Sequence, residues 1–255
     1  MKKSISFIVF ASLLLLASCQ KDAVENPGGG SGAPLKKLVQ TTVSGNMSLV
    51  YNADGTLKQT TKVTQGYTYV KNFDYAPGKV SYITLQGGKK LETGEYTMVN
   101  GKAVSVSLTY YDAYEDPYLT RTKTFQYNIK GLLEKVTYYD GSYSIFIYDA
   151  NSNLTERTYY NNQGQGLNKS EFFYGSQKDL SPRFGFFEFS GESFLTSPYA
   201  TYLPVKWKET DLLTAQVTYE DVMQYELDAQ GYVLKGKTHV ITGPYNDWEW
   251  TNSFE

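Results

Sequence analysis

The chain has 255 residues, and its 24 basic and 26 acidic side chains give a formal net charge of −2. The basic residues are scattered among acids, so no stretch could neutralise a row of nucleic-acid phosphates or grip anionic lipid headgroups. Its one cysteine excludes a disulfide bond within the chain.

The first segment has the pattern of a signal peptide. Lys2 and Lys3 precede an apolar run from Ile5 to Leu16, and small residues follow this run. The run is shorter than the roughly 20 apolar residues that a membrane-spanning helix needs. We therefore predict that residues 1–18 are a signal peptide that is cleaved from the mature protein.

The end of this segment, Leu16-Ala17-Ser18-Cys19, resembles a bacterial lipobox, in which the cysteine is acylated and becomes the first residue of the mature protein. An ordinary buried thiol is the alternative, but the only cysteine of the chain stands where a lipobox requires one. The resemblance implies attachment to a membrane through lipid on Cys19, and each buried methylene of that lipid adds ~0.8 kcal/mol.

The next residues, Gln20-Lys21-Asp22, resemble the export tag of Bacteroidetes lipoproteins that reach the outside of the outer membrane. The chain departs from that tag because Ala23 interrupts its acidic run and Glu25 comes late. The resemblance implies an outer-membrane lipoprotein that faces the cell exterior rather than the periplasm.

A run rich in glycine and proline separates this lipid site from the rest of the chain. Residues 19–34 contain the sequence NPGGGSGAP, which has almost nothing to bury, so we predict a lipidated N-terminus and a flexible linker. Residues 35–255 have a length that suits a single all-β domain.

The composition of the domain favours strands, because the chain has 24 tyrosines and 13 phenylalanines. In SYSIFIYD, Tyr143, Ile145 and Ile147 alternate with residues of the opposite face, which is the period of a strand. Asp140-Gly141 before it favours a hairpin turn. We therefore predict successive antiparallel hairpins.

An internal repeat supports the same architecture. Each copy places an apolar residue before Asn or Asp, then Gly or Ser, then Leu or Val, which predicts strand, turn, strand. The copies are YNADGTL from Tyr51, YNIKGLL from Tyr127, YDANSNL from Tyr148 and LDAQGYV from Leu227, with a shorter YAPGKV from Tyr75 and degenerate copies near Met98 and Phe172.

These repeats resemble the tyrosine and aspartate "YD" repeats of Rhs-type proteins. Taken with the lipobox, they are similar to a family of Bacteroidetes lipoproteins of unknown function with a porin-like β fold. The resemblance covers most of residues 35–255 and implies a curved antiparallel sheet or a partly open barrel. A barrel that spans the membrane is an alternative, but the polar residues on these strands argue against it.

Three prolines interrupt the strand pattern between residues 180 and 207. Pro182, Pro198 and Pro204 surround a short aromatic stretch, so we predict an interrupting loop, or a short helix around Glu192 to Leu195.

The sequence lacks the residues that most catalytic and metal sites require. His239 is the only histidine, and its place in KTHVI favours a structural or surface role. YDANSNL resembles a calcium loop, but Leu154 and Tyr160 stand where such a loop needs glycine and an acid. We therefore predict no metal, no cofactor and no catalytic residue.

Paired carboxylates are harder to dismiss, because a glycosidase needs only two acids about 5–10 Å apart. The candidates are Asp112, Glu115 and Asp116 in one segment, and Glu209 and Asp211 in another. Solvated turn acids are the interpretation that we prefer, and a hydrolase that acts on polysaccharides is kept as the alternative function.

Aromatic side chains provide the best binding hypothesis, since flat indole rings can pack against sugars. Trp248, Trp250 and Phe254 share one face of a predicted strand, and Trp207 ends the proline-rich segment. The alternative is that this face is core. We predict a binding or structural module rather than an enzyme, with a glycan or an envelope protein as its partner.

Overall fold

The computed structural model describes residues 37–42, 45–64, 66–178, 180 and 200–254. The predicted signal peptide, Cys19, the linker and the predicted short helix lie outside these residues. The described part of the chain forms sixteen β-strands and contains no helix.

The strands follow one another along the whole described chain. Their bounds are β1 Lys37–Thr42, β2 Gly45–Tyr51, β3 Leu57–Thr64, β4 Tyr67–Ala76, β5 Lys79–Gln86, β6 Lys89–Val99, β7 Lys102–Tyr111, β8 Pro117–Tyr127, β9 Leu133–Tyr138, β10 Tyr143–Tyr148, β11 Leu154–Tyr160, β12 Gly166–Lys178, β13 Tyr202–Asp211, β14 Gln216–Leu227, β15 Val233–Thr242 and β16 Trp248–Phe254.

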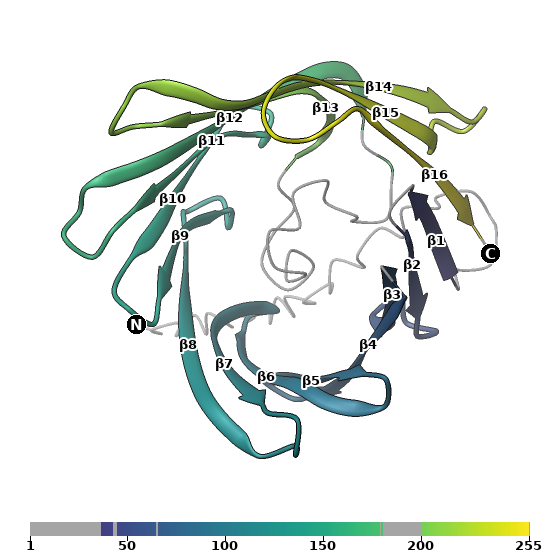
Figure 1. Cartoon of the computed structure of the whole chain (residues 1–255), viewed down its shortest axis with the longest axis vertical. Helices are drawn as coiled ribbons and strands as arrows, with labels where there is room; N and C mark the ends of the chain where they lie inside the picture. The colour runs from purple at the N-terminus through teal and green to yellow at the C-terminus, as the bar shows by residue number, and fades with distance from the viewer. Residues whose placement is uncertain (1–36, 43–44, 65, 179, 181–199, 255) are drawn as a thin grey trace, which may run out of the picture.

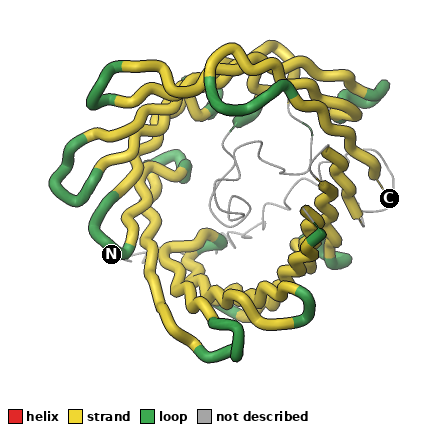
Figure 2. Tube along the Cα trace, viewed as in Figure 1, coloured by secondary structure: helices red, strands yellow, loops and turns green. Residues whose placement is uncertain are grey.

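Every strand pairs antiparallel with its neighbours in sequence, and the sheet closes into a barrel (Figures 1 and 2). Closure is made by β1 and β16, where Leu38 lies opposite Phe254 and Thr42 opposite Trp250. The prediction of an all-β fold from successive antiparallel hairpins is confirmed. The barrel is closed, because the last strand returns to the first.

Both ends of the described chain lie at one end of the barrel, which we call the terminal end. Lys37 pairs with Val50 at the start of β1, and Phe254 at the end of β16 pairs with Leu38. Since the strands run alternately up and down, the connections β9–β10, β11–β12 and β13–β14 lie at the opposite end, which we call the far end.

One turn geometry recurs in seven of the described hairpin connections. The carbonyl of the first residue of the turn accepts a hydrogen bond from the N–H three residues on, and its own N–H donates to the carbonyl four residues on. The residue at the fourth position always has a positive φ, which glycine adopts without strain. The turns begin at Asn52, Asp112, Asn128, Tyr138, Asp149, Asn161 and Asp228.

The turn in YDANSNL confirms that Asp149 and Ser152 are turn formers. The carboxylate of Asp149 accepts hydrogen bonds from the N–H groups of Asn151 and Asn153, both at 2.9 Å. Ser152 takes a left-handed conformation with a φ of 66°. Both donors belong to the turn itself, as the repeat predicts.

Two predictions about connections need correction. The predicted turn near Phe172 is wrong, because this stretch belongs to β12, which continues to Lys178. The predicted interruption at 180–207 ends early, since β13 begins at Tyr202. Pro204 enters this strand beside a register irregularity of β12 between Phe173 and Tyr174, where its missing N–H costs little.

The two faces of the sheet differ in burial. One face carries the core, including Tyr82, Leu108 and Phe125, which are at most 6% exposed. The opposite face carries exposed apolar residues such as Val63 and Ile147. Side chains converge on the concave side of a closed sheet and spread on its convex side, so the core face is the inner face of the barrel.

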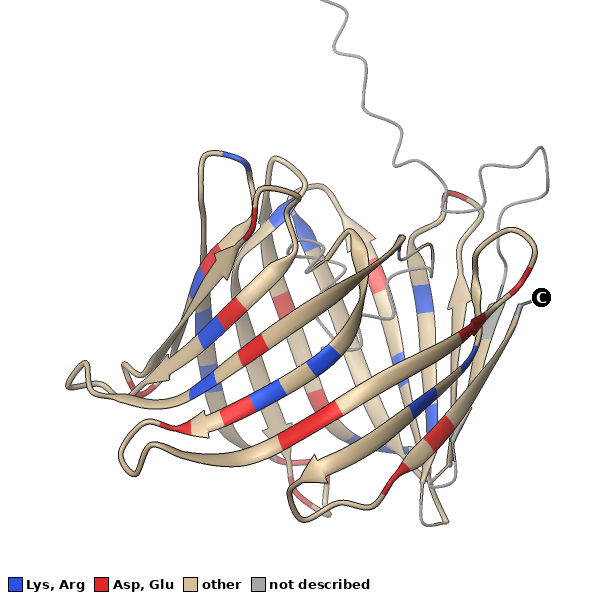
Figure 3. Ribbon diagram, turned by 90° about the horizontal axis from the view of Figure 1, so that it is seen from above, with Lys and Arg blue, Asp and Glu red and all other residues tan. Residues whose placement is uncertain are grey.

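Lysine and glutamate side chains pair along the outer face from β11 to β16. Blue and red segments lie on neighbouring strands in Figure 3. The shortest N···O distances are 2.6 Å for Lys206–Glu220, 3.0 Å for Lys235–Glu249 and 3.3 Å for Lys169–Glu171. These pairs are partly exposed, so each stabilises the fold by only about 0–1 kcal/mol. Their main consequence is that the outer face of these strands carries charged side chains.

Candidate functional site

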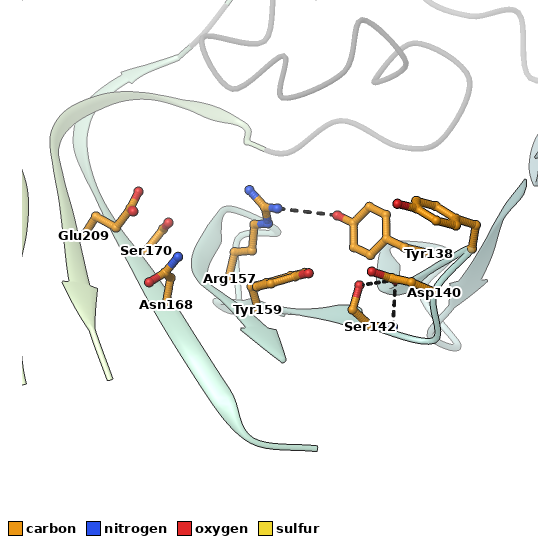
Figure 4. A pocket seen from close by; sticks show the side chains of 9 residues that line it. Tyr138, Asp140, Ser142, Arg157, Tyr159, Asn168, Ser170 and Glu209 are labelled. Carbon is orange, nitrogen blue, oxygen red and sulfur yellow. Dashed lines mark hydrogen bonds between the residues drawn. The ribbon is translucent and has the colours of Figure 1, made fainter. Parts of the chain in front are cut away.

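A hollow on the inner face lies near the far end of the barrel. Its volume is about 440 Å³, which is within the range of small-molecule sites. Strands β9, β11, β12 and β13 and the β9–β10 turn supply its walls (Figure 4). The lining residues are Tyr138, Tyr139, Asp140, Ser142, Arg157, Tyr159, Asn168, Ser170 and Glu209. We call this hollow the inner pocket.

Strand register brings the polar side chains of the inner pocket into one row. Arg157 of β11 pairs with Ser170 of β12, and Ser170 pairs with Glu209 of β13. Opposite residues on paired strands point to the same face, so all three side chains enter the pocket. This row joins residues that are 52 positions apart in sequence, Arg157 and Glu209.

Hydrogen bonds orient the guanidinium group of Arg157. Its Nε donates to Ser144 Oγ at 3.3 Å, and its Nη2 donates to the hydroxyl of Tyr138 at 3.4 Å (Figure 4). The rings of Tyr138 and Tyr159 meet edge to face, with centroids 5.9 Å apart. The guanidinium group of Arg157 therefore contacts one member of a tyrosine pair.

Two more cationic side chains contact the rings of tyrosines that line the inner pocket. The guanidinium carbon of Arg121 lies 4.3 Å from the ring centroid of Tyr139, and Lys123 Nζ lies 5.9 Å from that of Tyr138. Both distances fit cation–π contacts. Together with Arg157, these side chains place three cations near Tyr138 and Tyr139, where the carboxylate of Asp140 interacts with Arg121.

Two carboxylates also line the pocket. Asp140 accepts hydrogen bonds from the hydroxyl and the N–H of Ser142, at 2.6 and 3.0 Å. These bonds, the one from the hydroxyl first, hold the pKa of Asp140 below its ordinary value of 3.8. Asp140 is therefore ionised at neutral pH and is a poor general acid. Glu209, the second acid, comes from the KETD segment.

Asp221 is a buried acid on β14. It lies two positions after Tyr219, which pairs with Glu209 of β13. Asp221 is 1% exposed, and it accepts hydrogen bonds from the hydroxyl of Tyr219 at 2.7 Å and from the N–H of Trp207 at 3.2 Å. Burial raises the pKa of Asp221 above 3.8, and this effect outweighs the two hydrogen bonds. Folding thus favours the protonated carboxyl.

We expect Asp221→Asn to stabilise the protein at neutral pH but not in acid. A carboxyl with a raised folded-state pKa contributes no penalty below pH 3.8, where both states are protonated, and an increasing penalty as pH rises through its folded pKa. Asparagine resembles the protonated form. The melting temperature of the variant relative to wild type should therefore rise between pH 4 and 7. Asp74→Asn is the control, because Asp74 is an exposed residue of β4. If the melting temperatures of Asp221→Asn and wild type differ by the same amount at every pH, this account is contradicted.

The predicted aromatic site residues do not gather in the inner pocket. Trp207 is half-buried: it stacks on Phe172 with a centroid distance of 6.3 Å, and the tilted ring of Tyr219 lies 4.7 Å from it. Trp250 is 5% exposed and belongs to a second core cluster, against which the half-buried Trp248 packs. An indole buried to this degree cannot serve as an open sugar platform, so Trp250 is a core residue.

Phe254 is placed only through its backbone. It ends β16 and pairs with Leu38, and its side chain lies outside the described residues. The lipid attachment predicted at Cys19 also lies outside them.

The acids of the first candidate segment shape a turn at the far end. Asp112 accepts hydrogen bonds from the N–H groups of Tyr114 and Asp116, at 2.8 and 3.0 Å. Glu115 has a φ of 65° and accepts a hydrogen bond from the N–H of Lys90 at 2.5 Å. The interpretation of these residues as solvated turn acids is confirmed.

The second candidate pair is divided between two roles. Asp211 accepts hydrogen bonds from the N–H groups of Leu213 and Thr214, at 2.8 and 3.0 Å, and these bonds lower its pKa. Asp211 is a turn former, so the preferred interpretation is confirmed for this residue. For Glu209 that interpretation is wrong, because Glu209 lies within β13 and lines the inner pocket.

His239 occupies the surface role that the sequence favours. It lies on β15 with 61% of its side chain exposed, and its Nδ1 is 2.7 Å from a carboxylate oxygen of Asp247. Within the described ranges, no three His, Cys, Asp or Glu side chains cluster as metal ligands would.

Most of the inner-pocket residues escaped sequence analysis. Arg157 and Tyr159 alternate in TERTYY, and Asn168 and Ser170 alternate in LNKS, as any strand residues would. The signal that could have found Arg157 is a cation that shares one strand face with an aromatic residue, Tyr159, two positions on. Using this signal requires the strand register, which could not be read from the sequence.

Comparisons with known proteins identify the fold but not the family. The chain matches no family model and no curated protein. A porin-like protein from Bacteroides uniformis has a similar structure, with a TM-score of 0.63, 17% sequence identity and coverage of 87% of this chain and 98% of that chain. A porin-like protein from Bacteroides vulgatus gives a TM-score of 0.55 at 12% identity, with the same coverage of both chains. The chain therefore has a porin-like β-barrel fold.

Proposed function

We propose that this chain is an outer-membrane lipoprotein, anchored through an acylated Cys19, whose barrel lies outside the bilayer and binds a saccharide in its inner pocket. The observation that carries this proposal is the ionic outer face of the barrel. The similarity to porin-like proteins from Bacteroides supports an outer-membrane setting for this fold.

The ion pairs of the outer face support a barrel that lies outside the lipid. Lys169, Lys206 and Lys235 project from three different strands, each paired with a glutamate. A lysine on the lipid side of a barrel costs about 2–4 kcal/mol near the bilayer centre. A membrane barrel needs an apolar outer band instead. The strands of this barrel therefore favour water on both faces.

A barrel with charged side chains on its outer face needs another feature to hold it at a membrane. No helix in the described ranges has the length and hydropathy to span a bilayer. The lipobox resemblance at Cys19 supplies an anchor, and residues 19–34 supply a tether. We propose that this anchor faces the cell exterior, as the Gln20-Lys21-Asp22 resemblance implies.

The anchor would also orient the inner pocket. β1 begins at the terminal end, so a lipid on the preceding segment would hold that end toward the membrane. The β9–β10 turn beside the inner pocket lies at the far end. The pocket would then face away from the membrane, where a ligand from the medium can reach it.

The chemistry of the pocket favours binding over hydrolysis. Tyrosine rings can pack against the faces of a sugar, and the side chains of Asn168, Ser170 and Glu209 can exchange hydrogen bonds with its hydroxyls. A hydrolase would need a protonated acid beside the bond that breaks. Asp140, with its lowered pKa, does not supply that proton.

Cell fractionation tests the anchor directly. We expect the wild-type protein in the outer-membrane fraction, released by detergent and degraded when protease is added to intact cells. The same chain from Gln20, exported behind a signal peptide with an ordinary cleavage site, should be soluble and equally stable, because only the lipid holds it to the membrane. A non-lipidated chain that stays in the membrane would show that the barrel itself inserts, and would overturn the proposal.

A further inference from the structure

A second hollow lies on the outer face of the barrel, over strands β4 to β7 (Figure 1). Its volume is about 560 Å³, and we call it the outer groove. The outer groove is separate from the inner pocket, so its ligand would be additional to the one proposed above. We propose that the outer groove binds an uncharged linear polysaccharide, which lies across the strands.

Strand register arranges the side chains of the outer groove in two rows. Each row contains one residue from each of the four strands: Asn72, Ile83, Thr93 and Thr109 in the first, and Asp74, Ser81, Glu95 and Ser107 in the second. Between the rows, β5 carries Tyr82, a core residue that is 5% exposed. Since side chains alternate along a strand, both rows point outward.

The dimensions of the outer groove suit a chain rather than a single sugar. Neighbouring strands are about 4.8 Å apart, so each row extends about 14 Å across the sheet, and the two rows lie about 7 Å apart along the strands. The first row continues with a polar residue on either side, Gln59 of β3 and Thr120 of β8. A longer chain would therefore meet polar side chains beyond both ends of the groove.

The outer groove offers hydrogen-bonding groups that match the hydroxyls of sugars. Its two rows contain four hydroxyls, one amide and two carboxylates. Thr93 Oγ1 lies 3.2 Å from the hydroxyl of Tyr111, and Thr109 Oγ1 lies 3.3 Å from Thr120 Oγ1. A hydroxyl has one donor and two acceptor sites, so each of these contacts orients the group and leaves capacity for a ligand.

Charge excludes acidic ligands from the outer groove. Asp74 is exposed, and Glu95 forms an ion pair with Lys79 beside the groove. Among the described residues that line the groove, none is lysine or arginine. Phosphate, sulfate or carboxylate groups would therefore be repelled. Because Lys79 offsets one of the two acidic charges, a polycation would gain little, and an uncharged chain fits best.

A saccharide fits the outer groove better than a protein segment does. An extended peptide binds a sheet by adding a strand to a free edge, and this sheet is closed. A protein interface also needs apolar or aromatic anchors near its centre, whereas Ile83 is the one apolar side chain in the two rows. The hydroxyls of a polysaccharide match the polar side chains, and its C–H groups can contact Ile83.

A polysaccharide microarray tests the proposal with the mature lipidated protein in detergent micelles. The array carries the uncharged polymers xyloglucan, galactomannan and dextran, and the acidic polymers polygalacturonate and alginate. We expect binding to at least one uncharged polymer and to neither acidic polymer, because the acids of the groove repel carboxylates. Calorimetric titration with the polymer that binds then measures the affinity of the variants.

Filling the outer groove assigns the binding to these strands. Ser81→Ile combined with Ser107→Ile replaces two short side chains by bulky ones, and a β-branched residue suits a strand. We expect this double variant to bind the polymer at least about tenfold more weakly, because the added side chains clash with the ligand. Its circular dichroism spectrum should be unchanged.

Thr218→Ile is the matched control, because Thr218 is an exposed residue of β14, outside the groove. It should bind the polymer as wild type does. If the double variant unfolds, Ser107→Ile alone is the second test. Ser107 is exposed, and this variant should weaken binding severalfold.

The outcomes distinguish the outer groove from the inner pocket, which Asn168→Ile fills in the same way. Loss of polymer binding in Asn168→Ile, with binding retained in the double variant, would assign the polysaccharide to the inner pocket. That result would overturn this inference while the proposed function stands. Binding to no uncharged polymer, or equal binding to acidic and uncharged polymers, would also overturn it.

Discussion

Replacing Asn153 by alanine is expected to lower the free energy of unfolding by about 2–4 kcal/mol, because a buried amide would lose three hydrogen bonds at once. Asn153 is 1% exposed. Its Oδ1 accepts hydrogen bonds from the N–H groups of Thr201 and Tyr202, at 2.8 and 3.0 Å, and its Nδ2 donates to Asp149 at 2.9 Å. The side chain therefore joins the β10–β11 turn to the start of β13.

The loss of stability in Asn153→Ala comes from the hydrogen-bonding groups that lose their partner. Two backbone donors at the start of β13 would lose their acceptor, and the Asp149 carboxylate would lose a donor. Each unsatisfied buried group costs about 1–3 kcal/mol. Urea unfolding followed by tyrosine and tryptophan fluorescence would measure the change as a lower midpoint at a similar slope.

Asn151→Ala is the matched control, because Asn151 is exposed and belongs to the same turn. We expect it to change stability by less than about 0.5 kcal/mol. Similar losses for both variants would show that the turn, rather than its link to β13, accounts for the effect.

Replacing Gly236 by alanine, which adds one methyl group, is expected to destabilise the barrel by about 3 kcal/mol through overpacking. An added Cβ would lie 2.2 Å from Cε2 and Cζ2 of Trp250, far inside the contact distance of two carbons. The indole is 5% exposed and has Tyr225 beside it at a centroid distance of 6.2 Å. The rigid ring cannot turn away without disturbing this cluster.

Gly175→Ala offers a matched control on β12. Its added Cβ would lie 3.0 Å from a methyl group of Val205, a contact that a small shift relieves, so we expect a loss of less than about 1 kcal/mol. A double variant, Gly236→Ala with Trp250→Leu, should recover part of the stability that the single variants lose. Strict additivity of the two losses would show that the ring and the methyl group do not meet.

Local patterns predicted much of the architecture. The repeated Asn or Asp and the glycine or serine three residues later specify a turn through contacts within five residues, so the turns at Asn52, Asn128, Asp149 and Asp228 could be predicted. The alternation around Ile145 predicted a strand for the same reason. The turn at Asp112, where Glu115 takes the left-handed position in place of glycine, departs from the repeat and was not assigned as a copy.

The candidate site was less accessible to prediction, as Glu209 and Trp250 illustrate. The sequence favoured a solvated turn acid at Glu209, beside Asp211, but Glu209 lies on β13 in a row with Ser170 and Arg157. The sequence also suggested Trp250 as a platform, and burial within a second cluster makes it core. Both outcomes depend on partners from other strands.

The sequence by itself determined the all-β class, the hairpin order and most turns, because these depend on side chains and backbone within a few residues of each other. Only the tertiary structure decided that β16 returns to β1, which face is inner, and that Arg157, Ser170 and Glu209 share a pocket. Closure and register depend on strand twist and on pairings between distant segments. A periodic sequence describes each strand equally well on either face, and only the closed sheet distinguishes the two.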